Sequence, residues 1–332
     1  MAEVTLKNIF KSFGSQVALS DVSMTVPDSS FVVLLGPTGA GKTTTLRLVS
    51  GLDKPDSGTI LFDGVDIVAQ SPAQRNVAMV FQQYSLYPHL SVRENLAFPL
   101  KSPILRTPAE EITRKVEAVA ETLQISHKLD NKATELSGGE MQRVSIGRAL
   151  VRSPRVYLMD EPLSSLDAKL RSDLRIELKR IQASLGATML YVTHDQTEAM
   201  TMATHVGVLD LGKLVQFGTP REIYEDPVSI YAASRLGAPK INILPADLFP
   251  GAPAGAASIG LRPEHIRTGK GREAQVIRVE YLGDQTRLHL KLDNQNLVTL
   301  AEAHTRIQPG SCLKIAPQSP LYFGPDGERI KS

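Results

Sequence analysis

Apolar residues in the first two thirds of this sequence change between the spacing of strands and the spacing of helices. Val22, Met24 and Val26 alternate with polar residues, which predicts strands within residues 3–33, with a turn between the first two at 11–14. Four unbroken apolar runs have the length of buried strands: 31–35, 77–81, 156–159 and 189–192. Helical patterns separate these runs, and this alternation indicates a parallel, doubly wound α/β sheet.

Two smaller β segments belong to the same region. After a helix that is expected to end near Gly51, Gly58 and the pair Asp63-Gly64 separate short apolar segments, which predicts a small antiparallel sheet. Apolar residues at 206–209 and 213–216 predict a hairpin at the edge of the larger sheet.

The region from about residue 88 to 152 has the pattern of helices and indicates a helical insert in the α/β domain. The spacings Ser91 to Glu94 and Thr107 to Glu110 are those of capping boxes, and Pro108 is expected at the first helical position of the second helix. Two apolar stripes at helical period predict helices with one buried face: Ile112, Val116, Val119, Ala120 and Leu123, then Leu170, Leu174, Leu178, Ile181 and Leu185 before Gly186.

From about Pro239 the composition changes to a stretch rich in proline and glycine, and no long helical stripe follows. Leu288, Leu290 and Leu292 alternate with polar residues, and residues 293–296 supply a turn into 297–300, which predicts a half-buried hairpin. The sequence therefore predicts two domains, an α/β domain at 1–238 and a small β-barrel at 239–332.

Composition limits the function classes. The 332 residues carry a net charge of +2, so bulk electrostatics suggest no nucleic-acid partner. Cys312 is the single cysteine, which excludes an intramolecular disulfide framework and cysteine-rich zinc sites and favours a reducing cytosol. Neither a signal peptide nor an apolar run near the ~20 residues of a membrane helix is found. Any membrane role is expected to depend on a partner.

Residues 36–44 carry the strongest motif. They follow the apolar run 31–35 and match the phosphate-binding loop G-x-x-x-x-G-K-[ST]: Gly36, Pro37, Thr38, Gly39, Ala40, Gly41, Lys42, Thr43 and Thr44. Backbone N–H groups of such a loop and the positive end of the following helix bind phosphate oxygens. Lys42 is expected to reach the β- and γ-phosphates of a nucleotide, and the Thr43 hydroxyl to hold Mg²⁺.

Polar residues at the ends of two other predicted strands add candidate catalytic groups. Asp160 and Glu161 follow the run 156–159, and His194 follows 189–192, where ligands of parallel sheets usually bind. Asp160 is expected to hold Mg²⁺ through water, Glu161 to polarise the attacking water, and His194 to contact the γ-phosphate. Each type of residue also occurs as a plain loop charge or a structural histidine, so the assignment depends on the whole set.

Ser137, Gly138 and Gly139 precede a predicted helix and form a second helix N-terminus suited to phosphate. A single γ-phosphate cannot be contacted by both this segment and residues 36–44 when they lie on separate subdomains. A head-to-tail pair of chains resolves this conflict, because the loop of one chain then faces Ser137–Gly139 of the other. The alternative is an ordinary glycine-rich helix cap.

With these residues in order, the chain resembles the ATPase subunit of an ATP-binding-cassette importer of the maltose/sugar-importer type. The resemblance covers nearly the full chain and rests on these segments: 36–43, 80–90, 136–143 (the signature segment), 157–162, 164–167 (the D-loop) and 191–196. Residues 260–265 and 279–283 resemble the oligonucleotide/oligosaccharide-fold regulatory (TOBE) domain of that subgroup.

The resemblance implies further roles. Phe13 would stack on adenine, Gln82 would contact the Mg²⁺/water site and sense the transmembrane partner, and Asp167 would cross the dimer interface. It implies ATP and Mg²⁺ as ligands, Glu161 as catalytic base and His194 as γ-phosphate switch. The implied partners are a second copy, two transmembrane permease subunits and, indirectly, an extracytoplasmic solute-binding protein, at the cytoplasmic face of the membrane.

The chain departs from the family at three points. Glu140-Met141 stands where glutamine followed by arginine or lysine is usual, Ser165 where asparagine is common, and the regulatory domain is short. Sugars and polyol phosphates are the expected solutes, with polyamines and iron as alternatives. A soluble cassette ATPase acting on nucleic acid or ribosomes is a second hypothesis, and a C-terminal barrel that binds nucleic acid or sugar directly is a third.

Overall fold

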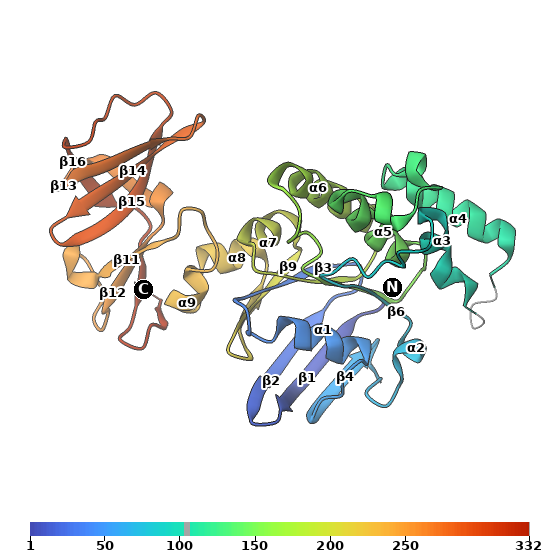
Figure 1. Ribbon diagram of the computed structural model, residues 1–332. Helices are drawn as coiled ribbons and strands as arrows, with labels where there is room; N and C mark the ends of the chain where they lie inside the picture. Colours follow the sequence, from blue (N-terminus) through green and yellow to red (C-terminus); the bar gives the residue numbers. More distant parts are fainter. Residues whose placement is uncertain (103–106, 332) are drawn as a thin grey trace. The chain divides into compact units, whose positions relative to one another are not determined.

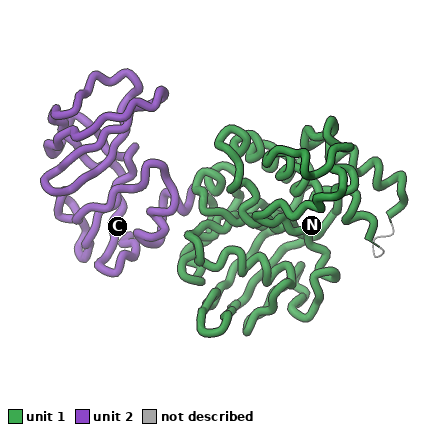
Figure 2. The backbone as a smooth tube through the Cα atoms, in the orientation of Figure 1, with its two compact units in different colours: residues 1–220 green, residues 221–332 purple. Residues whose placement is uncertain are grey.

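The computed structural model describes residues 1–102 and 107–331 and divides into two compact units, 1–220 and 221–332 (Figure 2). The sequence placed the domain boundary at 238/239 instead. Within the second unit, the guanidinium of Arg262 donates to the carbonyl oxygens of Tyr224 (2.8 Å), Ala233 (3.0 Å) and Leu236 (2.6 Å). These bonds attach the segment 221–238 to the C-terminal unit, although its composition is not that of a β domain.

The central element of the first unit is a six-stranded sheet in the order β10-β9-β3-β8-β7-β6. All neighbours are parallel except the edge hairpin β9/β10, so the predicted doubly wound arrangement and edge hairpin are confirmed. Its strands are β3 Phe31–Leu35, β6 Val77–Val80, β7 Val156–Asp160, β8 Met189–Thr193, β9 His205–Asp210 and β10 Lys213–Gly218. The strands β3, β7 and β8 are buried throughout, as expected of continuous apolar runs.

A second, antiparallel sheet has the order β2-β1-β4-β5 and confirms the small sheet expected from the sequence. Its strands are β1 Val4–Phe13, β2 Gln16–Val26, β4 Ser57–Phe62 and β5 Val65–Asp66. Helix α1, Lys42–Ser50, packs between the two sheets, because its Leu46, Leu48 and Val49 share one core with residues of both (Figure 1). The P-loop helix is thus held on two sides.

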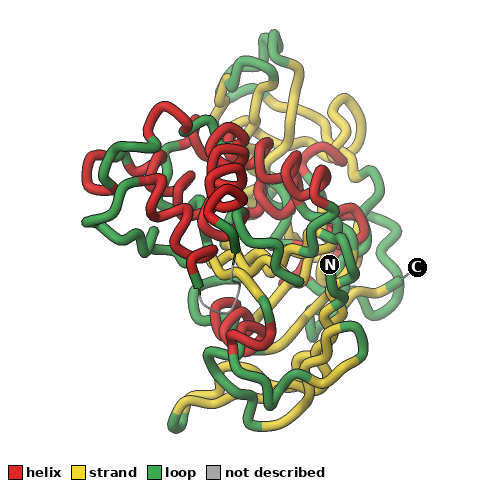
Figure 3. Tube along the Cα trace, turned by 90° about the vertical axis from the view of Figure 1, so that its right-hand side faces the viewer, coloured by secondary structure: helices red, strands yellow, loops and turns green. Residues whose placement is uncertain are grey.

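The longer helices lie on the other side of the six-stranded sheet from the antiparallel sheet (Figures 1 and 3). The helices of the first unit after α1 are α2 Pro72–Arg75, α3 Val92–Ala97, α4 Ala109–Thr122, α5 Gly138–Leu150, α6 Ala168–Leu185 and α7 Gln196–Met202. Short 3₁₀ turns at Phe98–Lys101, Ser126–Lys128 and Ala133–Glu135 complete the helical insert formed by α3, α4 and α5.

Most of the local helix predictions are confirmed. Ser91 caps α3 in a capping box with Glu94, and Gly186 ends α6 with a φ of 56°. The expected Thr107 box is wrong, because α4 begins at Ala109 with Pro108 as its N-cap and no side-chain cap bond there. The extended ψ of 148° at Pro108 explains the shift, since a residue with that backbone stands before the first turn. Leu185 is also wrong as a buried position, being 49% exposed in the last turn of α6.

The second unit begins at the second residue of α8 (Pro220–Glu225), contains α9 Ile230–Ala233, and is otherwise all-β, as predicted. Its two four-stranded antiparallel sheets have the orders β11-β12-β17-β18 and β15-β14-β13-β16 and share one core. The strands are β11 Asn242–Pro245, β12 Ser258–Leu261, β13 Ile266–Tyr281, β14 Gln285–Leu292, β15 Gln295–Glu302, β16 Cys312–Pro317, β17 Leu321–Phe323 and β18 Arg329–Ile330, with 3₁₀ turns at Ala246–Leu248 and Pro263–His265. Leu288, Leu290 and Leu292 of the predicted hairpin are buried.

Across residues 1–102 and 107–331, none of the helices has both the length and the apolar character required to cross a bilayer.

Candidate nucleotide-binding site

The loop between β3 and α1 has a backbone that only glycine tolerates at several positions. Gly39 and Gly41 have φ values of 82° and 99°, in the left-handed region. A Cβ on Gly41 would lie 2.7 Å from the carbonyl oxygen of Ala18, and one on Gly36 would lie 2.6 Å from that of Leu209. The neighbouring strands β2 and β9 therefore fix the path of the loop.

Lys42 lies at the start of α1 and is buried at 6% exposure. Its ammonium donates to the carbonyl oxygens of Gly36 (2.9 Å) and Pro37 (3.0 Å), and lies 3.6 Å from Oε1 of Glu161. A buried cation held at a glycine-rich helix N-terminus presents positive charge to any anion in the loop.

Thr43 and Asp160 come together from positions 117 residues apart. The Thr43 hydroxyl donates to Oδ1 of Asp160 at 2.9 Å, from the first turn of α1 to the end of β7. Burial raises the pKa of Asp160, and the adjacent charge of Glu161 adds to that rise, while the bond from Thr43 opposes it. A hydroxyl and a destabilised carboxylate side by side are hard oxygen ligands that a divalent cation would stabilise, so these two residues fit Mg²⁺.

Glu161 and His194 also meet, from the ends of the neighbouring strands β7 and β8. Nδ1 of His194 lies 3.1 Å from Oε2 of Glu161, and the backbone N–H of Glu161 donates to the carbonyl oxygen of Val192 at 3.1 Å. Glu161 has a φ of 44°, a left-handed conformation that costs a non-glycine residue free energy and is common at functional sites. The Glu161 side chain is 16% exposed and that of His194 61%, so solvent reaches both side chains.

A pocket of about 300 Å³ is lined by Lys42, Thr43 and Glu161 together with further expected residues. Asp160 and His194 are not in its described lining but contact Thr43 and Glu161, which are. Its lining includes the expected residues Phe13, Thr38, Gly39, Gly41, Lys42, Thr43, Thr44, Gln82 and Glu161. The Phe13 ring is 50% exposed, and the Lys11 ammonium lies 5.2 Å from its centre. The remaining members of the expected loop, Pro37 and Ala40, hold its shape, since the N–H of Ala40 donates to the carbonyl oxygen of Pro37 at 3.2 Å.

Sequence reasoning missed two residues of this pocket, Gln16 and Ala18. Both lie on β2, and Gln16 pairs directly with Phe13 in the β1/β2 register. Once Phe13 and the turn at 11–14 are predicted, Gln16 follows as the residue opposite Phe13 in the hairpin, so the sequence held a signal for Gln16.

Ser137, Gly138, Gly139 and Asp167 are not in the described lining of that pocket. Ser137 caps α5 and Asp167 caps α6, accepting from the N–H of Leu170 at 3.0 Å. A Cβ on Gly139 would lie 2.0 Å from Cδ2 of Leu170, so the second glycine of the signature segment allows α5 and α6 to approach closely. The structure therefore brings most of the expected residues together at one pocket, whereas Ser137, Gly138, Gly139 and Asp167 lie outside its described lining.

Glu140, where the family usually has glutamine, completes the cap of α5. The Ser137 N–H and hydroxyl donate to Oε2 of Glu140 at 2.8 and 2.9 Å, and the Lys128 ammonium lies 3.2 Å from Oε1. The bond from the Ser137 N–H holds the pKa of Glu140 below its ordinary value, with smaller contributions from the Ser137 hydroxyl and Lys128. The Glu140 carboxylate thus has three donors around it.

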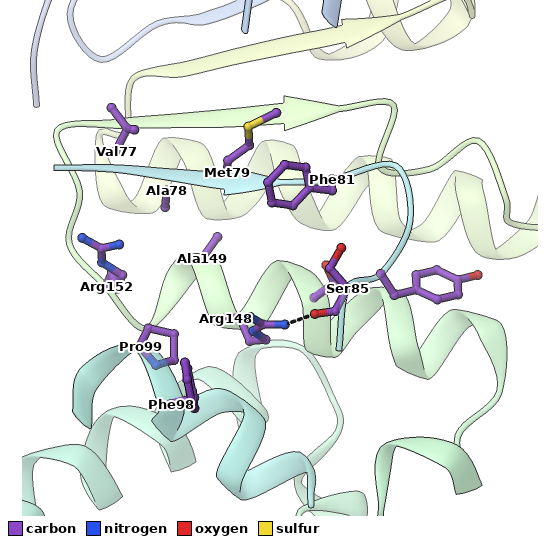
Figure 4. A pocket seen from close by; sticks show the side chains of 12 residues that line it. Val77, Ala78, Met79, Phe81, Ser85, Phe98, Pro99, Arg148, Ala149 and Arg152 are labelled. Atoms are coloured by element: carbon purple, nitrogen blue, oxygen red, sulfur yellow. Dashed lines mark hydrogen bonds between the residues drawn. The ribbon is translucent and has the colours of Figure 1, made fainter. Parts of the chain in front are cut away.

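A second pocket, of about 260 Å³, lies between β6 and the helical insert (Figure 4). Phe81 directly precedes Gln82 and is 40% exposed, and Phe98, from the insert, is 47% exposed. The Arg148 guanidinium donates to the carbonyl oxygen of Ser85 at 2.5 Å and lies 4.8 Å from the ring centre of Tyr87. Burial lowers the pKa of Arg148. Helix α5 is thereby bonded to the segment that carries Gln82.

Comparison with known proteins agrees with this geometry. The family model of the ABC transporter matches residues 19–164, and that of the TOBE domain matches residues 259–319. The sn-glycerol-3-phosphate import ATP-binding protein UgpC of Brucella abortus (strain 2308) is 42% identical over 99% of this chain and 99% of its own length. The maltose/maltodextrin import ATP-binding protein MalK of Yersinia pestis bv. Antiqua (strain Antiqua) is 40% identical over 100% of this chain and 98% of its own length.

Among solved structures, the dimeric bacterial ABC transporter cassette MJ0796 is similar with a TM-score of 0.60 and 28% identity, over 66% of this chain and 99% of that chain. A nucleotide-free ATP-binding cassette from an ABC transporter is similar with a TM-score of 0.59 and 31% identity, over 66% of this chain and 92% of that chain. Since full-length relatives share at least 40% of its residues, the chain belongs to the ATP-binding proteins of the ABC transporter family and carries a C-terminal TOBE domain.

Proposed function

We propose that this protein is the ATP-hydrolysing subunit of a membrane importer and that two copies hold two ATP molecules between them. The observation that carries the proposal is the meeting of Lys42, Thr43, Asp160, Glu161 and His194 at one end of the parallel sheet, beside a pocket lined by Phe13. These residues are the parts that phosphoryl transfer requires: charge neutralisation, positioning and a base.

In the proposed reaction, a water attacks the γ-phosphorus while Glu161 accepts its proton. The bond from the γ-phosphorus to the oxygen that bridges it to the β-phosphate breaks, and ADP and phosphate leave. Lys42 and the N–H groups of the loop stabilise the phosphate charge, and His194 binds a γ-phosphate oxygen and orients Glu161. Phe13 stacks on the adenine.

Mg²⁺ held at this site would neutralise the negative charge of the nucleotide's phosphate oxygens. The hydroxyl of Thr43 would bind it directly, Asp160 would hold it through water, and the Gln82 amide would complete the set. The pairing of Thr43 with a buried, poorly solvated Asp160 supports this assignment.

The signature segment and Asp167 are proposed to act in trans. The signature segment of one copy, Ser137–Gly139, would close on the γ-phosphate held by residues 36–44 of the other copy. Asp167 would cross the dimer interface to the nucleotide site of the other copy. Their absence from the pocket that Phe13 and Lys42 line supports this division.

The experiment on Glu161 tests the whole scheme. Glu161→Gln is expected to retain ATP binding, to accumulate as an ATP-dependent dimer and to lose turnover by at least a hundredfold, the scale of a catalytic base. Glu225→Gln, which changes an exposed carboxylate paired with Arg221, is the matched control and should hydrolyse ATP at the parental rate. Parental turnover in Glu161→Gln would contradict the role of Glu161.

The partners are proposed to be two permease subunits, which would keep the protein peripheral at the cytoplasmic face of the membrane, and indirectly a solute-binding protein. The exposed Phe98 and the exposed Phe81, which directly precedes Gln82 in the sequence, support a permease contact at the second pocket. Phe98→Asp is expected to abolish co-purification with the permease and to leave ATP binding intact. Ile176→Asp, at an apolar residue of α6 that is 70% exposed, should leave the complex intact.

The solute is proposed to be a sugar or a polyol phosphate. The relatives that import glycerol-3-phosphate and maltodextrin support this class, since they match the chain over its whole length. The reconstituted complex should show ATPase stimulation by a binding protein loaded with such a solute. Stimulation by a polyamine- or iron-loaded binding protein would contradict the proposed class, and stimulation by DNA or ribosomes would contradict the importer.

A further inference from the structure

We infer that the Glu140 carboxylate forms a latch on the Ser137 hydroxyl, which ATP bound to a second copy must release before the two copies close, and that Lys128 partly neutralises the charge of this carboxylate. The latch would raise the ATP concentration that closure requires. This inference deepens the proposed function and rests on its head-to-tail dimer.

In the single chain, the N–H and the hydroxyl of Ser137 both donate hydrogen bonds to the Glu140 carboxylate. Its hydroxyl donates to Oε2 of Glu140 at 2.9 Å and accepts from the Glu140 N–H at 3.4 Å, and its own N–H donates to the same Oε2 at 2.8 Å. A hydroxyl has one proton, so Ser137 cannot donate to this carboxylate and to a phosphate oxygen together. The bond to an ionised acceptor is about twice as strong as a neutral one, and the phosphate must compete with it.

Lys128 offsets the charge that this arrangement leaves at the helix end. Its ammonium lies 3.2 Å from Oε1, the carboxylate oxygen that Ser137 does not use, and comes from the 3₁₀ turn Ser126–Lys128, outside α5. The Lys128 and Glu140 side chains are 29% and 24% exposed, so their charges are screened only in part. Without Lys128, the carboxylate would repel an approaching triphosphate.

Substitutions of Glu140 and of Lys128 are therefore expected to change the ATP concentration that closure requires in opposite directions. The Glu140→Gln substitution keeps the side-chain length and the capping ability, because capping boxes use Glu or Gln, but it removes the ionised acceptor. The Lys128→Met substitution removes the compensating cation and leaves the carboxylate. A purely structural cap would make both changes neutral or both unfavourable.

The test measures the ATP concentration at which half of the full-length protein becomes dimeric, in a Glu161→Gln background that prevents turnover. Glu140→Gln is expected to lower this midpoint about three- to tenfold, and Lys128→Met to raise it by a similar factor, the size of one partly screened charge. Both effects should shrink at about 0.5 M salt, where screening is strong. The affinity of the monomer for a fluorescent ATP analogue and the thermal unfolding midpoint should stay unchanged.

Glu117→Gln is the matched control, because its carboxylate also belongs to an ion pair of the insert, 3.7 Å from Arg93. It should leave the midpoint unchanged. An unchanged midpoint in Glu140→Gln, or shifts of the same sign in Glu140→Gln and Lys128→Met, would overturn the latch alone. A background protein that binds ATP and never dimerises would overturn the proposed function as well, so the two failures are distinguishable.

Discussion

Replacing Gly139 with alanine separates packing from nucleotide contact at the signature segment. The added Cβ would lie 2.0 Å from Cδ2 of Leu170. Carbon atoms in contact are about 3.5–4.0 Å apart, so the two groups must separate by roughly 1.5 Å. Overpacking of this kind costs about 1–3 kcal/mol, and the half-buried Leu170 side chain can move, which favours the lower part of that range.

A second effect acts in the opposite direction. Gly139 lies in the first turn of α5, where alanine gains about 0.5–1 kcal/mol over glycine from the unfolded state and helix propensity. The expected net effect of Gly139→Ala is therefore a loss of about 1 kcal/mol. In a Leu170→Ala background the obstructing methyl is absent, and the same substitution should stabilise the protein by up to about 0.5–1 kcal/mol.

These four proteins form a double-mutant cycle, which urea unfolding can measure. The helical circular dichroism signal reports on the unit that contains Gly139 and Leu170, since the longer described helices all belong to the first unit. The free energies of unfolding of the parent, the two single variants and the double variant give the coupling between Gly139 and Leu170, expected at about 1–2 kcal/mol. If Gly139→Ala changes the free energy of unfolding equally in both backgrounds, the close approach of α5 and α6 is not the reason for a glycine at position 139.

Three further predictions concern single side chains. Asp160→Asn should stabilise the nucleotide-free protein at neutral pH by about 0.5–2 kcal/mol while abolishing turnover. Burial raises the pKa of Asp160, so its stabilising contribution is present at low pH and is lost as pH rises through the folded-state pKa. The advantage of asparagine should therefore fade on acidification, which thermal unfolding at several pH values checks; an advantage that grows at low pH would refute the sign. Ser91→Ala removes the oxygen that accepts from the Glu94 N–H at 3.1 Å and should cost about 1 kcal/mol in urea unfolding, whereas Ser91→Asp should cost little. Phe13→Ala should weaken binding of ATP and GTP alike by about 1–3 kcal/mol in titration calorimetry, because stacking is tolerant of base identity, and Phe13→Trp should restore it.

The sequence by itself determined the features that depend on neighbouring residues. Four unbroken apolar runs identified strands of the six-stranded sheet, because a strand covered on both faces leaves no position for polar residues. Gly36 to Thr43 were recognised because the phosphate loop is built by one continuous segment with fixed spacing. The Ser91 cap was found for the same reason, since its partner lies three residues away.

Only the tertiary structure decided which distant groups meet. Asp160 contacts Thr43, and Glu161 contacts His194, because β3, β8 and β7 are neighbours in the sheet and end at the same edge. The attachment of residues 221–238 to the β unit depends on the buried Arg262, whose acceptors are backbone carbonyls that no sequence pattern reveals. Glu140 shows the difference most directly. The sequence showed a negative charge in a first helical turn. Its fixed position between Ser137 and Lys128 depends on the fold of the insert, which places Lys128, twelve residues earlier in the chain, beside the Glu140 carboxylate.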